Sequence, residues 1–143
     1  SNMFVTLIVG ILDLETGILK LCNAGHNPPI LIYPDGQVSY LEFKTQIFVG
    51  VVEDFKYSDE EVVLEKESKL FLYTDGVTEA ENINKELYGE EKLLEMLSDN
   101  ASSDVRTTVN VVVDSIASHV KEAEASDDLT ILLIQYEPGT ANS

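Results

Sequence analysis

Basic residues, cysteine and long apolar segments are all scarce in this sequence. It has nine Lys and Arg against 26 Asp and Glu among 143 residues, so its net charge at pH 7 is −17. Nucleic acids are bound largely through Lys and Arg, so this composition argues against a nucleic-acid partner. The same charge disfavours contact with anionic membranes. An anionic substrate would need a positive centre, which a bound metal ion can supply.

Other absences indicate where the protein works. The single cysteine, Cys22, cannot form an internal disulfide, so nothing indicates an oxidising compartment. No apolar run approaches the ~18 residues of a membrane span, and no basic segment followed by an apolar stretch marks a secretory signal. We therefore expect a cytoplasmic segment that does not itself contact a membrane. Ser1 and Asn2, ahead of Met3, resemble a cloning remnant.

The length and the 44% hydrophobic content are typical of one globular domain, which we place at residues 3–137, ahead of a polar tail at 138–143. Apolar runs bounded by turn residues predict strands at 3–12, 18–24, 30–33, 38–41, 60–64, 69–73 and 129–136. We expect the first and last of these to be buried on both faces, and residues 44–59 to form a long connection. Helical spacing follows at 77–81, 90–97 and 104–121. Strands first and helices later predict an α+β fold, with helices packed on an antiparallel sheet.

Two acidic positions stand at the ends of predicted strands. Asp75 follows the strand at 69–73, and Asp127 and Asp128 precede the strand at 129–136. If these strands are antiparallel neighbours, the acids share one sheet edge. Carboxylates brought together repel unless a cation intervenes, and oxygen ligands suit Mg²⁺ or Mn²⁺. The alternative is that both positions are solvated turn residues.

The remaining reactive side chains have simpler interpretations. His26, just before Asn27 and a proline pair, is a possible ligand or acid, but a local hydrogen-bonding anchor is the favoured interpretation. His119 is expected to be an exposed helix residue, and Cys22 a small core residue. The sequence contains no Ser-His-Asp motif, phosphate-binding glycine loop or zinc-type spacing of Cys and His.

Several segments, taken in order, resemble one enzyme family. They are residues 3–7 (Met-Phe-Val-Thr-Leu), 23–29 (Asn-Ala-Gly-His-Asn-Pro-Pro), 72–80 (Leu-Tyr-Thr-Asp-Gly-Val-Thr-Glu-Ala), 88–89 (Tyr-Gly) and 127–130 (Asp-Asp-Leu-Thr). Together they resemble the metal-dependent Ser/Thr protein phosphatases of type 2C, in the bacterial branch of sporulation-stage-II-E and sigma-regulatory phosphatases. The resemblance covers nearly the whole chain, from Met3 to Tyr136.

The resemblance implies a fold, a site and a reaction. The fold is a truncated αββα sandwich, and the metal ligands fall on Asp75 and Asp127. Gly76, Asp128, Thr74 and His26 become supporting residues. Two Mn²⁺ or Mg²⁺ ions activate a water that attacks the phosphorus of a phosphoserine or phosphothreonine. The implied substrate is a phosphorylated anti-sigma-factor antagonist.

The sequence also departs from the family pattern. Family members carry an upstream Gly-Asp pair and a further aspartate, and this sequence begins after that region. Asp13, in a predicted turn, cannot replace them. We therefore expect the C-terminal part of a catalytic domain, with weak metal binding and little activity of its own. Exposed sheet edges are expected to favour a homodimer. The alternative is a non-catalytic binding module that keeps the phosphatase fold.

Overall fold

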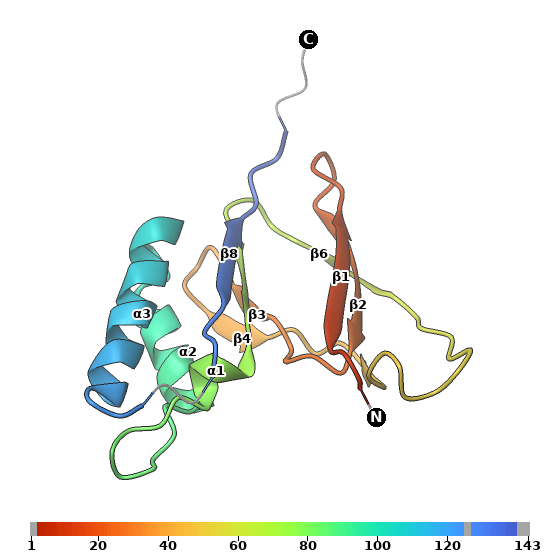
Figure 1. Ribbon diagram of the computed structural model, residues 1–143. Coiled ribbons are helices and arrows are strands. Elements are labelled where there is room, and N and C mark those ends of the chain that lie inside the picture. Colours follow the sequence, from red (N-terminus) through yellow and green to blue (C-terminus); the bar gives the residue numbers. More distant parts are fainter. Residues whose placement is uncertain (1–2, 125–126, 140–143) are drawn as a thin grey trace.

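The computed structural model describes residues 3–124 and 127–139, which form two sheets and a layer of helices (Figure 1). The strands are β1 (Leu7–Leu12), β2 (Ile18–Ala24), β3 (Ile30–Ile32), β4 (Val38–Tyr40), β5 (Thr45–Gln46), β6 (Glu60–Val63), β7 (Lys69–Tyr73) and β8 (Ile131–Gln135). The helices are α1 (Asp75–Thr78), α2 (Glu90–Asp99) and α3 (Val105–Val120). One sheet has the order β1-β2-β5, with β6 also paired to β2, and the other has the order β4-β3-β7-β8.

The two predicted hairpins are present, and local turn chemistry explains both. Between β1 and β2, the Asp13 carboxylate accepts hydrogen bonds from the amides of Glu15 and Thr16 at 2.9 and 3.1 Å. Between β3 and β4, the Asp35 carboxylate accepts the amide of Gln37 at 2.9 Å. Both hairpins are antiparallel. The expected connection at 44–59 contains the short strand β5, which runs parallel to the end of β2.

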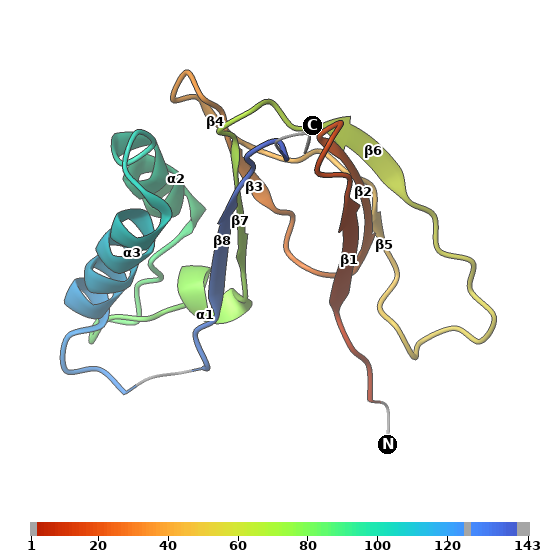
Figure 2. The same ribbon diagram turned by 90° about the horizontal axis from the view of Figure 1, so that it is seen from above.

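Two apolar cores lie between the layers, whose arrangement Figure 2 shows from above. One lies between the sheets, where Leu21 of β2 faces Leu31 and Leu70 of the other sheet. The second lies between the β4-β3-β7-β8 sheet and the helices α2 and α3. Burial of each large apolar side chain contributes about 1.5–3 kcal/mol, so these cores hold the layers together. The expected α+β fold with helices packed on an antiparallel sheet is confirmed.

The two long helices form as the sequence spacing predicts. Leu93 and Leu97 of α2 are fully buried, and so is Val112 of α3. The Asp104 carboxylate caps α3 by accepting the amide of Thr107 at 2.8 Å. No helix within the described ranges has both the length and the apolar character needed to cross a membrane.

The burial expected for the first and last strands is wrong. In β1 the side chains of Val9 and Ile11 are 52% and 71% exposed, and in β8 those of Leu132 and Ile134 are 55% and 45% exposed. Both strands are edge strands of their sheets. Within residues 3–124 and 127–139, helices cover only the β4-β3-β7-β8 sheet, so the outer face of the other sheet is open. Cys22 is accordingly half-buried and not a core residue.

Candidate metal centre

The ends of β7 and β8 position the two acidic segments. These strands are antiparallel neighbours, with Tyr73 opposite Ile131. One step further, the amide of Thr74 donates to the carbonyl of Thr130 at 3.1 Å, and the amide of Thr130 donates to the Thr74 hydroxyl at 3.1 Å. The strand pairing on which the shared acidic edge depended is therefore present. Thr74 ties the exit of β7 to the entrance of β8.

Asp75 and Asp127 line the same cavity, at this end of the sheet. It has a volume of about 140 Å³ and is lined by Thr6, Gly25, His26, Asn27, Thr74, Asp75 and Asp127. Both carboxylate residues are exposed to solvent. The structure thus brings together two acids that are far apart in the sequence. Their role as metal ligands stays a prediction.

Each carboxylate is held by one hydrogen bond from a neighbouring N–H group. The side-chain amide of Asn27 donates to Oδ1 of Asp75 at 2.7 Å, and the backbone amide of Asp128 donates to Oδ1 of Asp127 at 2.8 Å. Within the described ranges, these bonds engage one oxygen of each carboxylate, which leaves the other oxygen for a cation. Asp128 therefore orients the Asp127 carboxylate through its backbone amide.

Gly76 lets the Asp128 backbone approach the start of α1. A Cβ atom at Gly76 would lie 2.2 Å from the carbonyl oxygen of Asp128, which is closer than any van der Waals contact allows. The Thr74 hydroxyl lies 3.4 Å from the same carbonyl oxygen. A side chain at position 76 would therefore displace the segment that carries Asp127.

His26 and Asn27 belong to a turn that a buried asparagine stabilises. The Asn23 side chain, 1% exposed, accepts the amide of His26 at 2.8 Å and donates to its carbonyl at 2.9 Å. Nδ1 of His26 lies 3.2 Å from the carbonyl oxygen of Asn27. The favoured interpretation of His26 as a hydrogen-bonding anchor agrees with these contacts, although its ring also lines the cavity. The sequence reasoning missed Asn27; the signal was an asparagine at a proline break, where such side chains bond nearby groups.

Tyr73 is the buried phenol nearest to the acidic edge in sequence. Burial raises the pKa of Tyr73 above its usual 10.0, and the negative charges of Glu90 and Asp75 act in the same direction. The phenol therefore stays protonated at neutral pH. It can donate a hydrogen bond but cannot act as a base.

The donor set fits a hard cation held by few protein ligands. Asp75 and Asp127 supply carboxylate oxygens, and Mg²⁺ is usually bound by one or two carboxylates, with water and substrate phosphate as its other ligands. No group of three or more His, Cys, Asp or Glu side chains able to hold a metal ion occurs in the part of the chain that the structure describes. The residues thus fit one weakly held ion better than a pair.

A second cavity adjoins the first and opens between the two sheets. It has a volume of about 270 Å³ and is lined by Thr6, Leu7, Ile8, His26, Leu72, Tyr73, Thr74, Thr130 and Leu132. Its walls come from β1 and from the end of β8, which lie on the same side of the sandwich (Figures 1 and 2). The sandwich is therefore open beside the candidate metal centre.

Solved phosphatase domains share this architecture. The RsbU and RsbW domains of Rv1364c from Mycobacterium tuberculosis superpose with a TM-score of 0.73 at 25% identity, over 94% of this chain and 37% of theirs. The Mn-presoaked phosphatase domain of the cell fate determinant SpoIIE from Bacillus subtilis gives a TM-score of 0.70 at 16% identity, over 94% of this chain and 58% of that domain. The fold is therefore that of part of a type 2C phosphatase domain, with one helix layer of the αββα sandwich in the described residues.

Sequence comparison identifies the branch within this class. The family model of Stage II sporulation protein E (SpoIIE) matches residues 1–137, and the chain belongs to this family. Protein IcfG of Synechocystis is 29% identical over 132 residues, which cover 92% of this chain and 20% of IcfG. Phosphoserine phosphatase RsbP of Bacillus subtilis is 28% identical over 138 residues, covering 96% of this chain and 32% of RsbP. The chain thus spans between a fifth and a third of these relatives, and the resemblance of its motifs to the family is confirmed.

Proposed function

We propose that this chain carries part of the active centre of a metal-dependent phosphoserine/phosphothreonine protein phosphatase. Asp75 and Asp127 hold Mn²⁺ or Mg²⁺, and the observation that carries the proposal is that both carboxylates line one polar cavity. When bound, a divalent ion supplies positive charge for a phosphate dianion and lowers the pKa of a coordinated water. The family membership and the phosphatase fold support the same conclusion.

The other residues of the centre orient these ligands. Asn27 fixes the Asp75 carboxylate, and the Asp128 amide fixes Asp127. Thr74 joins the two strand ends, and Gly76 gives the Asp128 backbone the space that it occupies. The Asn23 side chain holds the turn that presents His26 and Asn27. Such partners set the orientation of metal ligands and change the affinity for the metal when they are removed.

The proposed substrate is a phosphorylated protein of the anti-sigma-factor antagonist type. The relative RsbP is named a phosphoserine phosphatase, and the motifs of this chain resemble those of the sigma-regulatory branch, for which the resemblance implies this substrate. With 26 acidic and nine basic residues, this chain has little positive side-chain charge to attract a phosphate. Recognition of the phosphate therefore depends on the metal.

Thermal unfolding with added Mn²⁺ tests the metal site. A ligand that binds only the folded state raises the melting temperature, and we expect a small rise that needs Mn²⁺ in the millimolar range, on the order of 1 mM, because only two carboxylates meet. Asp75→Asn and Asp127→Asn remove the rise. The control variant, Asp114→Asn, loses one negative charge from α3 and is expected to keep the Mn²⁺-dependent rise in melting temperature. A wild-type melting temperature that does not change when Mn²⁺ is added would contradict the proposal.

A non-catalytic binding module is the second candidate, favoured by the finding of two carboxylates where a two-ion site needs more. Hydrolysis of a phosphoserine peptide in Mn²⁺ tests whether this chain is an active enzyme. We predict little turnover by this chain. Rapid turnover that Asp75→Asn abolishes would overturn that prediction and exclude the non-catalytic module. Metal binding without turnover is the result expected of a partial active centre, whereas a module without a metal site leaves the melting temperature unchanged in Mn²⁺.

We further propose that the chain self-associates through its exposed sheet edges. The edge strands β1 and β8 leave apolar side chains in water, with Ile11 and Leu132 71% and 55% exposed. Unpaired edges of this kind pair readily with another chain.

A further inference from the structure

The connection between α1 and α2 is a compact loop, residues 79–89, which we call the Asn82 loop. Its backbone folds back on itself. The amide of Tyr88 donates to the carbonyl of Ala80 at 2.8 Å, and that of Asn82 donates to the carbonyl of Glu86 at 3.0 Å. Glu81 and Leu87 form an antiparallel bridge between these two bonds. The loop therefore has the form of a small hairpin.

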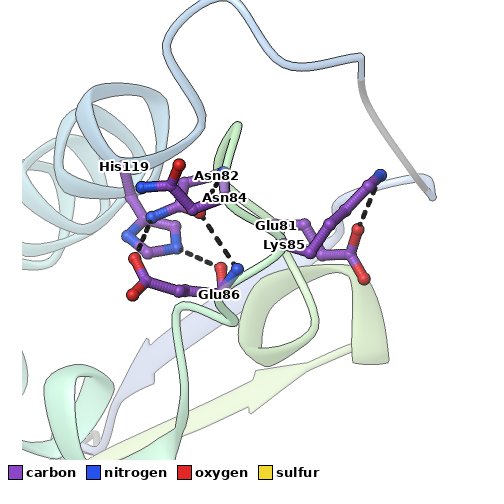
Figure 3. A network of polar contacts seen from close by, with 6 residues as sticks. All are labelled: Glu81, Asn82, Asn84, Lys85, Glu86 and His119. Carbon is purple, nitrogen blue, oxygen red and sulfur yellow. Dashed lines mark hydrogen bonds and ion pairs between the residues drawn. The ribbon is translucent and has the colours of Figure 1, made fainter.

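The Asn82 side chain fills the tip of this hairpin, as Figure 3 shows. Its Oδ1 accepts the amides of Asn84 and Glu86 at 2.9 and 3.0 Å. Its Nδ2 donates to the Glu86 carboxylate at 2.7 Å. One side chain thus satisfies two backbone donors and a carboxylate, which restricts the loop to one conformation.

The loop is also fastened to α3. Nε2 of His119 lies 2.9 Å from the carbonyl oxygen of Glu86 (Figure 3), so His119 is half-buried and bonded, where the sequence predicted an exposed residue. Tyr88, 3% exposed, packs edge-on against the His119 ring with centroids 5.6 Å apart. Its hydroxyl donates to Ser115 at 3.0 Å. These contacts hold the loop in place against the helix layer.

Two large aliphatic side chains of this fixed loop project into water. Ile83 is 77% exposed and Leu87 is 54% exposed. Their backbone is already ordered, so a partner that buries them loses little further conformational freedom. Burial of the apolar area of both side chains then contributes favourably to the free energy of binding.

The loop adjoins the candidate metal centre. A cavity of about 100 Å³ is lined by Ala80 and Glu81 at the start of the loop, together with Gly76 and Asp127. Asp127 also lines the cavity that it shares with Asp75. The start of the Asn82 loop therefore lies next to Asp127, one of the two candidate metal ligands.

The negative charge of the Asn82 loop limits which residues a partner can place against it. The loop carries Glu79, Glu81 and Glu86, and its single cation, Lys85, is paired with Glu81 at 3.1 Å (Figure 3). An acidic segment is repelled by this surface and by the net charge of −17. Aliphatic, non-acidic residues around the phosphoserine complement it.

We propose that the Asn82 loop docks the phosphoprotein substrate, with Ile83 and Leu87 contacting aliphatic residues that flank the phosphoserine. This inference depends on the proposed function, because the phosphate must occupy the site of Asp75 and Asp127. The two side chains determine specificity and touch no reacting atom. Asn82 and His119 are positioning residues, because they act through the loop.

Two fluorescent phosphoserine peptides test the proposal, one with leucines beside the phosphoserine and one with serines there. Binding to the full chain is measured by fluorescence anisotropy in Mn²⁺. We expect the wild type to prefer the leucine peptide by about tenfold, as expected from burial of apolar anchors. The double variant Ile83→Ser/Leu87→Ser loses this preference and still binds the serine peptide as the wild type does. The control Ile11→Ser, at a similarly exposed position on β1, keeps the preference.

The variants separate failure of the docking surface from failure of the metal site. Asp75→Asn weakens both peptides equally if the proposed function holds. A double variant that keeps the leucine preference, with an unchanged melting temperature, overturns the docking proposal and leaves the metal site standing. A wild type without any preference overturns it as well. If Asp75→Asn leaves the binding of both peptides unchanged, the proposed function is overturned, and this inference with it.

Discussion

Individual polar atoms determine the geometry of the candidate metal centre. The Asn27 amide reaches Asp75 across 48 positions of sequence, and the Asp128 amide holds the carboxylate of its neighbour Asp127. Each interaction is a single hydrogen bond to a charged group, the kind that is short and strong. Small displacements of either donor therefore move a candidate ligand. Gly76 is the residue where such a displacement is easiest to impose.

The variant Gly76→Ala is expected to damage both stability and metal binding. Its Cβ atom would meet the Asp128 carbonyl oxygen at 2.2 Å, so the segment carrying Asp127 must move. Overpacking of this kind costs about 1–3 kcal/mol in the free energy of unfolding. Urea unfolding measures the loss, and thermal unfolding with Mn²⁺ measures the weaker metal response. In the control Gly139→Ala, the added Cβ atom has no neighbour within 4 Å, so the free energy of unfolding is expected to stay unchanged. Equal behaviour of the two variants would contradict the packing at Gly76.

Secondary-structure elements follow the local pattern closely where one face is buried. The spacing of Leu93 and Leu97 predicts α2, and the stripe through Val112 and Ile116 predicts α3; all four side chains are buried. The start of α3 depends on a single side chain. Asp104 caps α3 through the amide and hydroxyl of Thr107.

The cap of α3 makes stability depend on pH in the acid range. The backbone hydrogen bond from Thr107 lowers the pKa of Asp104 below its usual 3.8. The stabilising effect of Asp104 is therefore complete above pH 3.8 and is lost as the pH falls through the lowered folded-state value. Asp104→Asn keeps an acceptor and loses the charge, so the gap in urea midpoint between wild type and variant is expected to shrink at acid pH. Asp114→Asn in the middle of α3 is the control. A gap that is the same at neutral and acid pH would contradict this role.

The molecule as a whole has one covered sheet and one open sheet. Helices α2 and α3 pack on β4-β3-β7-β8, and the outer face of the β1-β2 sheet faces solvent in the described residues (Figure 2). The buried Lys69 supports this arrangement, because its ammonium group donates to the carbonyls of Ala101 and Ser103 and fastens the α2–α3 connection to the sheet. The edge strands β1 and β8 lie on one side, beside the candidate metal centre.

The open edges lead to a prediction about oligomeric state. We expect the mass measured by light scattering to rise with concentration, because an edge strand with exposed apolar side chains pairs with another copy. Ile11→Lys places a charge on β1 and is expected to keep the chain monomeric. Val113→Lys changes an exposed residue of α3 and serves as the control. A wild type that stays monomeric at high concentration would count against self-association.

The sequence alone predicted the two long helices, most of the strands and the turn chemistry between them. It missed β5, and it placed the first helix at 77–81, where α1 spans Asp75–Thr78. Turn residues such as Asp13 and Asp35 act within a few positions, and helical spacing reports which face is apolar, so local patterns determine these features. The ordered set of five motifs resembled the family to which the chain belongs. The predicted strands placed Asp75 and Asp127 at the ends of two strands that are neighbours in the structure.

Tertiary structure decided what lies against these elements. An apolar run such as β1 has the same sequence whether or not another layer covers it, so its exposure depended on which elements pack nearby. The Asn27–Asp75 bond, the space above Gly76 and the anchoring of the Asn82 loop by His119 all join residues distant in sequence. Periodicity carries no information about such pairs, because they form only when the two sheets and the helices are brought together.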